Sequence, residues 1–271
     1  MPTLADVNSV VGRLWPPEGA EAWDASGLVS GDPTAPVDRI HLAVDAVADT
    51  IDEALVLGAG ILLVHHPLLL RGVTSVAEDR YKGAMIARLI RGGCALIAAH
   101  TNADVVDTGT SAMLARALGL DDVRPLTAAA AGSGGLGRIG RIPEPTTLGR
   151  LARQLAGILP ATAQGVRVSG DYGAPVRTVA LCGGAGDSLL AHPAVRGADV
   201  YITSDLRHHP ASEARENARV AGGPFLIDVS HWASEWLWLD QAASELREAL
   251  PGLAVTVSEL RTDPWDFLIV Q

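Results

Sequence analysis

The chain of 271 residues is 48% hydrophobic and 19% charged, which is typical of a globular protein and excludes a disordered one. Its 21 basic and 31 acidic residues give a net charge of −10, which argues against nucleic acid or an anionic membrane as the main partner. The start of the sequence lacks the pattern of a secretory signal, and no apolar run approaches the roughly 18–20 residues of a membrane span. Cys94 and Cys182 lie far apart in apolar segments, so we expect buried thiols in a cytoplasmic, reducing compartment.

The first half of the chain predicts alternating helices and strands. Apolar residues at helical spacing, with glycines where the pattern stops, predict helices over residues 4–15, 48–57 and 80–91. Short apolar runs predict strands over residues 40–44, 61–64 and 94–99. This alternation is typical of a mostly parallel sheet covered by helices.

The second half repeats three landmarks in the same order. Val37–Leu42 resembles Val176–Leu181, Gly58–His66 resembles Gly197–His209, and Gly92–His100 resembles Gly222–His231. The repetition predicts an α/β fold of two linked, duplicated α/β domains, residues 1–126 and 127–271, whose mostly parallel mixed sheets are flanked by helices. The strand ends of both domains would face a metal site between them. Chance similarity between α/β units is the alternative.

A small-residue segment, Ala128–Gly135, predicts a flexible linker between the halves. Directly after it, Gly135–Gly140 matches the G-x-G-x-x-G pattern of dinucleotide sites. That pattern needs a strand before it and a helix within it, whereas Pro143 and Pro145 block a helix here. We therefore expect a glycine-rich strand, with the next helix over Thr147–Leu159.

Two adjacent histidines, His65 and His66, follow the apolar run Ile61–Val64 and precede Pro67. Adjacent side chains of a strand point to opposite faces, so both rings converge only if the chain turns there. Histidine is seldom buried without a partner, and one interpretation is a pair of metal ligands. The other is a strand-end turn with two partly exposed histidines.

Further histidines and acids favour the metal interpretation. His100 and Asp104, and likewise His231 and Glu235, stand four residues apart, which places them on one face of a helical turn. Each pair taken singly is typical of an ordinary helix start. Taken together with the double histidine, they indicate a site for Zn²⁺, Fe²⁺ or Mn²⁺. The set exceeds what one tetrahedral ion needs, and a carboxylate can bridge two ions.

At these residues the chain resembles the GTP cyclohydrolase I type 2 homologues, a family of hexameric proteins with a dinuclear metal centre. The matching stretches span nearly the whole chain: Trp23-Asp24-x-x-Gly27-Leu28, Leu63–Leu68, His100-Thr101-Asn102-x-Asp104, Thr203-Ser204-Asp205-x-x-His208-His209, Asp228-x-x-His231-x-x-Ser234-Glu235 and Thr262–Trp265. His-His-Pro with His-x-x-Ser-Glu is specific, and the other stretches are supportive. Ser204 departs from the family, which usually has glycine before the acid.

The resemblance implies that His65, His66, Asp104, His231 and Glu235 bind two divalent metal ions per chain, with Glu235 as a bridge. It also implies a homohexamer and a small-molecule substrate such as a nucleotide. The chain lacks a long domain that some relatives insert between the halves.

Other polar residues are candidates for catalysis. We expect His100 to orient Asp104 or to transfer protons, and His208 and His209 to act as acid, base or substrate-binding groups. A hydrogen-bonded strand-end pair is the alternative for His208 and His209. Asp45 is either an acceptor that orients a ligand or a helix N-cap.

Two classes of function remain open at this point. The first is a metal-dependent hydrolase that opens the ring of GTP or cleaves a phosphoester. The second is a non-enzymatic metal-binding module for metal storage, metal delivery or partner regulation. An enzyme needs an open coordination position beside a polar pocket, whereas a storage protein does not.

Overall fold

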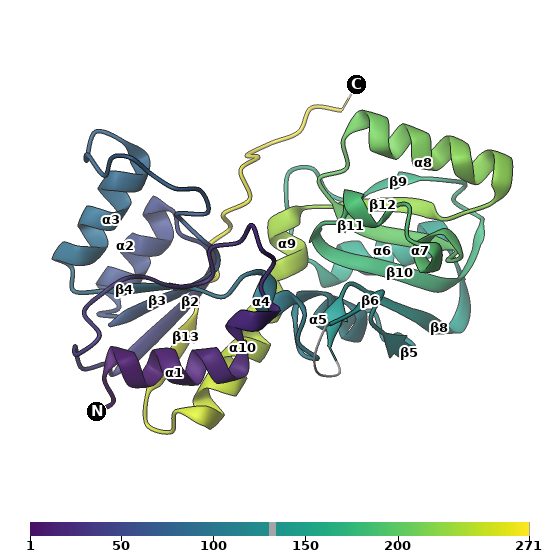
Figure 1. Ribbon diagram of the computed structural model, residues 1–271. Helices are drawn as coiled ribbons and strands as arrows, with labels where there is room; N and C mark the ends of the chain where they lie inside the picture. The colour runs from purple at the N-terminus through teal and green to yellow at the C-terminus, as the bar shows by residue number, and fades with distance from the viewer. Residues whose placement is uncertain (130–133, 271) are drawn as a thin grey trace. The chain divides into compact units, whose positions relative to one another are not determined.

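The computed structural model describes residues 1–129 and 134–270, which form two compact units (Figure 1). Unit 1 comprises Met1–Val106 and Leu239–Thr262, and unit 2 comprises Asp107–Trp238 and Asp263–Gln271. This division differs from the expected boundary between residues 126 and 127. The reason is strand pairing, because a strand after Val106 joins the sheet of unit 2 and a strand after Leu239 joins the sheet of unit 1.

Unit 1 is built on a five-stranded sheet with the order β1-β4-β3-β2-β13. The strands are β1 (Gly27–Ser30), β2 (Arg39–Asp45), β3 (Ile61–His66), β4 (Ala95–Ala98) and β13 (Ala254–Val257). Four of them are parallel, and β1 lies antiparallel to β4 at one edge. Nearly every side chain of β2, β3 and β4 is buried, as expected for parallel strands covered on both faces.

Helices cover both faces of this sheet, with α2 and α3 on one side and α1 and α10 on the other (Figure 1). The helical segments of the unit are α1 (Leu4–Leu14), the 3-10 turn η1 (Pro17–Gly19), α2 (Ala48–Val56), α3 (Tyr81–Arg91), α4 (Thr101–Asp104) and α10 (Trp238–Ala249). The three helices expected from the sequence are confirmed to within one residue at each end. A capping box between Thr3 and Asp6 fixes the start of α1.

Unit 2 contains a six-stranded mixed sheet with the order β5-β8-β10-β11-β12-β9 and a small hairpin, β6-β7. The strands are β5 (Asp121–Arg124), β6 (Thr127–Ala128), β7 (Gly135–Leu136), β8 (Arg138–Thr147), β9 (Arg167–Ser169), β10 (Pro175–Ala185), β11 (Val200–Ser204) and β12 (Phe225–Val229). Strands β10, β11 and β12 are parallel, and the pairings of β5, β8 and β9 are antiparallel. The expected mixed α/β fold is therefore confirmed in both units.

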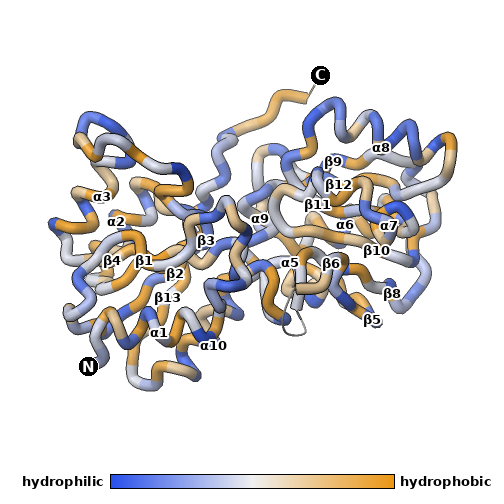
Figure 2. The backbone as a smooth tube through the Cα atoms, in the orientation of Figure 1, coloured by the Kyte–Doolittle hydropathy of each residue, from blue (hydrophilic) through white to orange (hydrophobic). Residues whose placement is uncertain are grey.

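The helical segments of unit 2 are α5 (Thr110–Ala117), α6 (Leu148–Ile158), the 3-10 turn η2 (Asp187–Leu189), α7 (Pro193–Arg196), α8 (His208–Ala221) and α9 (His231–Trp236). Helices α7 and α8 pack on the sheet through a cluster that includes Val195, Tyr201 and Leu226. Figure 2 shows apolar residues along the strands of this sheet and mostly hydrophilic ones along α8. Helix α8 thus uses a few alanines against the sheet and presents polar side chains elsewhere.

The strand registers agree with the predicted duplication. In unit 1, Ile40 pairs with Ile61 and Ile61 pairs with Ala95 across three parallel strands. In unit 2, Val179 pairs with Val200 and Val200 pairs with Phe225 in the same way. These are the positions that the three sequence echoes match to one another. In both sheets an antiparallel strand follows the third of these strands at the edge.

The segment expected to link the halves lies within unit 2. Thr127 pairs with Leu136 and Ala128 pairs with Gly135, so its ends form the β6-β7 hairpin. Residues 130–133 lie outside the described residues. Glycine is required at position 135, because φ is +153° and a Cβ would lie 2.1 Å from the carbonyl oxygen of Thr127. The G-x-G-x-x-G stretch forms β7 and the start of β8, so the predicted glycine-rich strand is confirmed.

Both cysteines are buried thiols, as expected. Burial raises the pKa of Cys94 to about 11, which keeps it protonated. In the described part of the chain, no helix is long and apolar enough to cross a membrane.

Candidate metal centre

Three histidines of unit 1 meet at the carboxyl ends of two neighbouring parallel strands. His65 and His66 are the last residues of β3, and His100 follows β4 and precedes α4. Their ring centroids lie 5.1 to 5.6 Å apart. Each ring offers a nitrogen within 4.8 Å of the nitrogens of the other two, which is a spacing that one metal ion could use. Strand β3 extends beyond the predicted residues 61–64, because His66 still pairs with Asp45 of β2.

The Nδ1 atom of each ring faces an oxygen acceptor. His65 Nδ1 lies 2.8 Å from the carbonyl oxygen of Ala99, His66 Nδ1 lies 2.7 Å from Asp45 Oδ1, and His100 Nδ1 lies 2.7 Å from Asp24 Oδ1. Because these oxygens accept, Nδ1 donates its proton, and the lone pair of each ring is on Nε2. A backbone carbonyl or carboxylate behind each imidazole is the usual support of metal-ligating histidine.

Asp104 closes the group from α4. Its Oδ1 atom lies 3.6 Å from Nε2 of His65, and its backbone N–H donates to the carbonyl oxygen of His100. The predicted helical turn between His100 and Asp104 is therefore present. The arrangement brings a carboxylate and three imidazoles together, which is a donor set suited to Zn²⁺, Fe²⁺ or Mn²⁺.

Asp24 holds the His100 ring in place, a role that was not predicted from the sequence. Its carboxylate accepts hydrogen bonds from His100, from the hydroxyl and the backbone N–H of Thr101, and from Ser26. Burial raises the pKa of Asp24, but the hydrogen bonds from His100, Thr101 and Ser26 lower it well below its usual range. Asp24 stands in the Trp23–Leu28 stretch that carried the family resemblance, so that stretch was the available signal.

Asp45 is an orienting acceptor and not the cap of α2. Its two oxygens accept from His66 Nδ1 and from the hydroxyl of Thr262, whereas the N-cap of α2 is Val47. Of the two sequence interpretations, the N-cap was wrong. Thr262 belongs to another of the quoted stretches, and its contact with Asp45 gives that stretch a role within unit 1.

Unit 2 places His231 and Glu235 together on α9. His231 Nε2 lies 3.0 Å from Glu235 Oε1, as their spacing of four residues predicted. His231 Nδ1 lies 2.7 Å from Asp205 Oδ2, so this ring has the same support as the three in unit 1. Asp205, directly after Ser204, takes the left-handed conformation at φ 58°. Glu235 is almost fully buried.

The electrostatics of His231 follow from its two acidic neighbours. Burial lowers the pKa of His231, but the negative charge of Glu235 and the hydrogen bond that His231 donates to Asp205 raise it well above the ordinary value. For His100, burial and the neighbouring His65 lower the pKa. A cation is therefore favoured beside Glu235, whether it is a proton or a metal ion.

Gly184 of β10 lies against this pair. Its φ is +70°, and a Cβ there would lie 2.4 Å from Glu235 Oε1 and 3.2 Å from His231 Nε2. Its backbone N–H donates to Ser234 Oγ over 2.9 Å. Only glycine fits this position, and sequence reasoning missed it because one of many glycines carries no local signal.

His208 and His209 are not at a strand end, so that expectation was wrong for these two histidines. They are the first residues of α8 and are exposed, with their rings 5.2 Å apart. Among the described residues, neither belongs to a group that could hold a metal. Of the six histidines named as candidates from the sequence, four therefore belong to groups that could hold a metal, and His208 and His209 do not. The catalytic roles of His100, His208 and His209 stay predictions.

Known proteins are similar to this chain over nearly its whole length. Residues 2–264 match the family model Duf34/NIF3 (NGG1p interacting factor 3). A "GTP cyclohydrolase 1 type 2 homolog" of Streptomyces coelicolor is 48% identical over 98% of this chain and 94% of that protein. One from Mycobacterium tuberculosis is 37% identical over 97% of this chain and 96% of that protein. That alignment runs over 371 residues, so the mycobacterial protein contains residues that this chain lacks.

Solved structures show the same fold. A hypothetical protein of Staphylococcus aureus is 27% identical, with a TM-score of 0.89 over 99% of this chain and 100% of that chain. A Bacillus cereus protein related to NIF3 is 24% identical, with a TM-score of 0.89 over 98% of this chain and 99% of that chain. The second likeness concerns the fold.

Proposed function

Because this chain belongs to the Duf34/NIF3 family, we propose that it holds two divalent metal ions and acts as a metal-dependent hydrolase on a nucleotide or phosphoester. One observation carries the proposal. The Nδ1 atoms of His65, His66, His100 and His231 all donate to a carbonyl or carboxylate oxygen, so Nε2 is the nitrogen of each ring that would bind a metal once it is deprotonated. An oxygen acceptor at Nδ1 is the usual arrangement behind a metal-ligating histidine, and four rings here share it.

The residues that would hold the ions are those expected from the sequence. His65, His66 and Asp104 come from unit 1, and His231 and Glu235 come from unit 2, with Glu235 proposed as the bridge. The mixture of imidazole and carboxylate fits zinc, iron or manganese. His100, whose ring adjoins both histidines of β3, is proposed to orient the centre or to transfer a proton beside it.

The bound ions would supply Lewis-acid polarisation of a phosphoryl group or of a ring carbon–nitrogen centre. The protein supplies orientation, because Asp24, Asp45 and Asp205 hold their histidines in fixed positions. Burial of His65 and Glu235 keeps water from competing for these side chains.

The test measures metal content and turnover on the same preparation. Protein purified without added metal or chelator is analysed for its elements, then incubated with GTP and with p-nitrophenyl phosphate. We expect two metal ions per chain and turnover of one substrate that disappears on chelation and returns with metal. Full metal content with no metal-dependent turnover of either substrate would contradict the hydrolase and favour a non-enzymatic metal-binding module.

The homohexamer implied by the resemblance is part of the proposal. Sedimentation analysis of the metal-loaded chain should give six times the chain mass of 28.1 kDa. A monomer across the accessible concentration range would refute it.

Replacing Asp45 by asparagine should weaken metal binding about 10–100-fold, because the amide supports the His66 imidazole less well than the carboxylate does. Asp49→Asn is the matched control, because Asp49 is an exposed acid on α2. Metal titration of both variants measures the effect. Equal affinities for the two would show that Asp45 has no part in holding His66 for a metal.

Replacing Gly184 by alanine should reduce metal occupancy, because the added methyl group would displace the Glu235 carboxylate. Gly165→Ala is the matched control, because Gly165 also has positive φ, at +60°, but its Cβ would meet no atom within 4 Å. Both variants lose backbone freedom in the same way. Elemental analysis should show a loss in the Gly184 variant only, and equal occupancy in both would contradict the close approach.

A further inference from the structure

The chain passes from unit 1 to unit 2 for the last time between two adjacent residues, Thr262 and Asp263. Each of them forms a side-chain hydrogen bond within its own unit, Thr262 with Asp45 and Asp263 with Ser230. Both of these partners stand directly beside proposed metal ligands. The two-residue crossing therefore reaches the surroundings of the metal centre in each unit separately.

In unit 1, the hydroxyl of Thr262 fixes the carboxylate that orients His66. It donates to Asp45 Oδ2, while Asp45 Oδ1 accepts from His66 Nδ1 over 2.7 Å. The terminal torsion of an aspartate is broad when nothing holds the carboxylate. With one oxygen held by Thr262, the other keeps a fixed direction toward the imidazole, which is the support that a metal-ligating histidine needs.

In unit 2, Asp263 is an almost fully buried carboxylate that is held at both oxygens. Its Oδ2 atom accepts from the hydroxyl of Ser230, and its Oδ1 atom accepts from the backbone N–H of Trp265 over 3.1 Å. Burying a carboxylate is unfavourable unless it is hydrogen-bonded. Pro264 also restricts the backbone of Asp263 to extended conformations. Asp263 therefore presents a fixed acceptor to Ser230.

Ser230 transmits this contact to the helix that carries two proposed ligands. It is the N-cap of α9, and its Oγ atom accepts from the backbone N–H of Ala233 over 3.2 Å. A serine hydroxyl has one proton and two lone pairs, so donation to Asp263 leaves the lone pairs for Ala233. His231 is the first residue of α9 and Glu235 lies one turn later, so the cap fixes the position of both.

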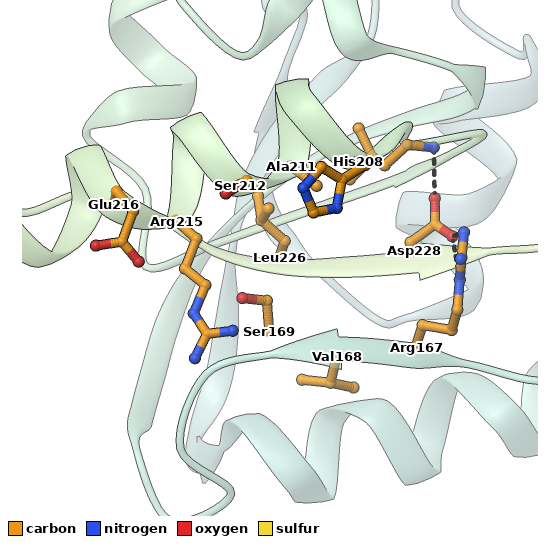
Figure 3. A pocket seen from close by; sticks show the side chains of 11 residues that line it. Arg167, Val168, Ser169, His208, Ala211, Ser212, Arg215, Glu216, Leu226 and Asp228 are labelled. Atoms are coloured by element: carbon orange, nitrogen blue, oxygen red, sulfur yellow. Dashed lines mark hydrogen bonds and ion pairs between the residues drawn. The ribbon is translucent and has the colours of Figure 1, made fainter. Parts of the chain in front are cut away.

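The strand that leads into α9 is held by another carboxylate. Asp228 of β12 lines a cavity beside α8 and pairs with Arg167 of β9 (Figure 3). Its Oδ1 atom accepts from the backbone N–H of Leu206 over 2.9 Å, and Leu206 follows Asp205, which supports the imidazole of α9. Asp228 thus holds the end of β12, and Asp263 holds the start of α9 two residues later.

We propose that Thr262 and Asp263 are positioning residues of the metal centre, which orient ligands of both units from one crossing of the chain. This inference rests on the proposed metal centre. Because the two residues are adjacent, a displacement of the crossing moves both supports at once. We expect neither side chain to touch a metal ion or a substrate.

The test titrates Co²⁺ into the metal-free full chain and follows the visible absorption, which depends on the ligands around the ion. Thr262→Val keeps the shape of the side chain and removes the hydroxyl, so it should weaken Co²⁺ binding about tenfold and change the spectrum. Thr262→Ser keeps the hydroxyl and should retain both. Thr34→Val is the matched control, because the Thr34 hydroxyl also donates to an aspartate, Asp32, over 2.8 Å at an exposed position.

Asp263→Asn should have an effect of similar size. Asparagine has one acceptor oxygen in place of two, so it cannot hold both Ser230 and Trp265. Asp171→Asn is the matched control, because Asp171 Oδ1 accepts from the backbone N–H of Gly173 over 2.7 Å in the same type of turn, at an exposed position.

A glycine inserted between Thr262 and Asp263 keeps both side chains and changes only their spacing. If one crossing orients both supports, this insertion should weaken Co²⁺ binding about tenfold or more. A glycine inserted between Asp266 and Phe267, which are exposed, is the control and should leave binding unchanged. Equal affinities for the two insertions would overturn the proposal.

Circular dichroism and thermal melting of the same samples separate positioning from folding. If Thr262→Val and Asp263→Asn lower the melting temperature while their Co²⁺ affinities and spectra equal those of the controls, the two residues serve folding alone and the proposal is overturned. The metal centre would then still stand. Absence of Co²⁺ binding by the unchanged protein would instead refute the metal centre, and this proposal with it.

Discussion

Replacement of Glu235 by alanine is expected to remove both metal ions, whereas replacement of His65 by alanine should remove mainly one. A bridging carboxylate serves two sites, and a terminal imidazole serves one. Glu235 is almost fully buried, and its Oε1 atom lies 3.0 Å from His231 Nε2. Elemental analysis after gel filtration measures both stoichiometries.

A folding defect could mimic the loss of metal, so the experiment needs two further variants. Glu235→Gln keeps the shape of the side chain and removes its charge, and Glu248→Ala removes an exposed acid from α10. Circular dichroism should show folded protein for both. We expect metal loss in the glutamine variant and full occupancy in the Glu248 variant. Equal losses of metal in the Glu235 and His65 variants would contradict the bridge.

The parallel strands were predictable because burial on both faces leaves a plain signal. Ile61–Val64 and residues 40–44 are short apolar runs, which a covered parallel strand requires. Helix ends were predictable where glycine or a cap marks them, as at Gly92 after α3. Such signals lie within a few residues of each other, so a short stretch of sequence is enough to predict these strands and helix ends.

The division into units was not predictable from local signals. Strand β13 pairs with β2, which lies more than 200 residues earlier in the sequence. The local sequence of Ala254–Val257 does not indicate that pairing partner. The segment Ala128–Gly135 was predicted to be a linker for the same reason. Glycine and alanine occur both in linkers and in tight hairpins such as β6-β7. Whether such a segment forms a linker or a hairpin depends on strand pairing between residues that are distant in the sequence.

The sequence predicted those histidines and acids of the candidate site that stand at a recognisable spacing. His231 and Glu235 stand four residues apart and do meet on one helical turn. Asp24 and Asp205 could not be assigned roles, because each reaches its histidine from a distant part of the sequence. Aspartate in a loop more often caps or turns the chain, so a supporting role becomes visible only in the fold.

Chelation of the metal is expected to lower the melting temperature without unfolding either sheet. The proposed ligands come from both units, so the ions would join them in addition to the three points where the chain passes from one unit to the other. A ligand that binds only the folded state adds about 2.7 kcal/mol when its free concentration is 100 times its dissociation constant. For a chain of this size, that corresponds to roughly 5–10 °C.

Thermal melting and small-angle scattering with and without a chelator test this expectation, with loss of metal verified on the same samples. The Glu235→Gln variant is the control, because a chain that holds no metal should melt at the same temperature in both conditions. A wider scattering envelope after chelation, with the circular dichroism of the sheets retained, is the expected result, because the joint between the units loosens while each core stays packed. An unchanged melting temperature and envelope after confirmed metal loss would mean that packing and the chain crossings hold the units together without the ions.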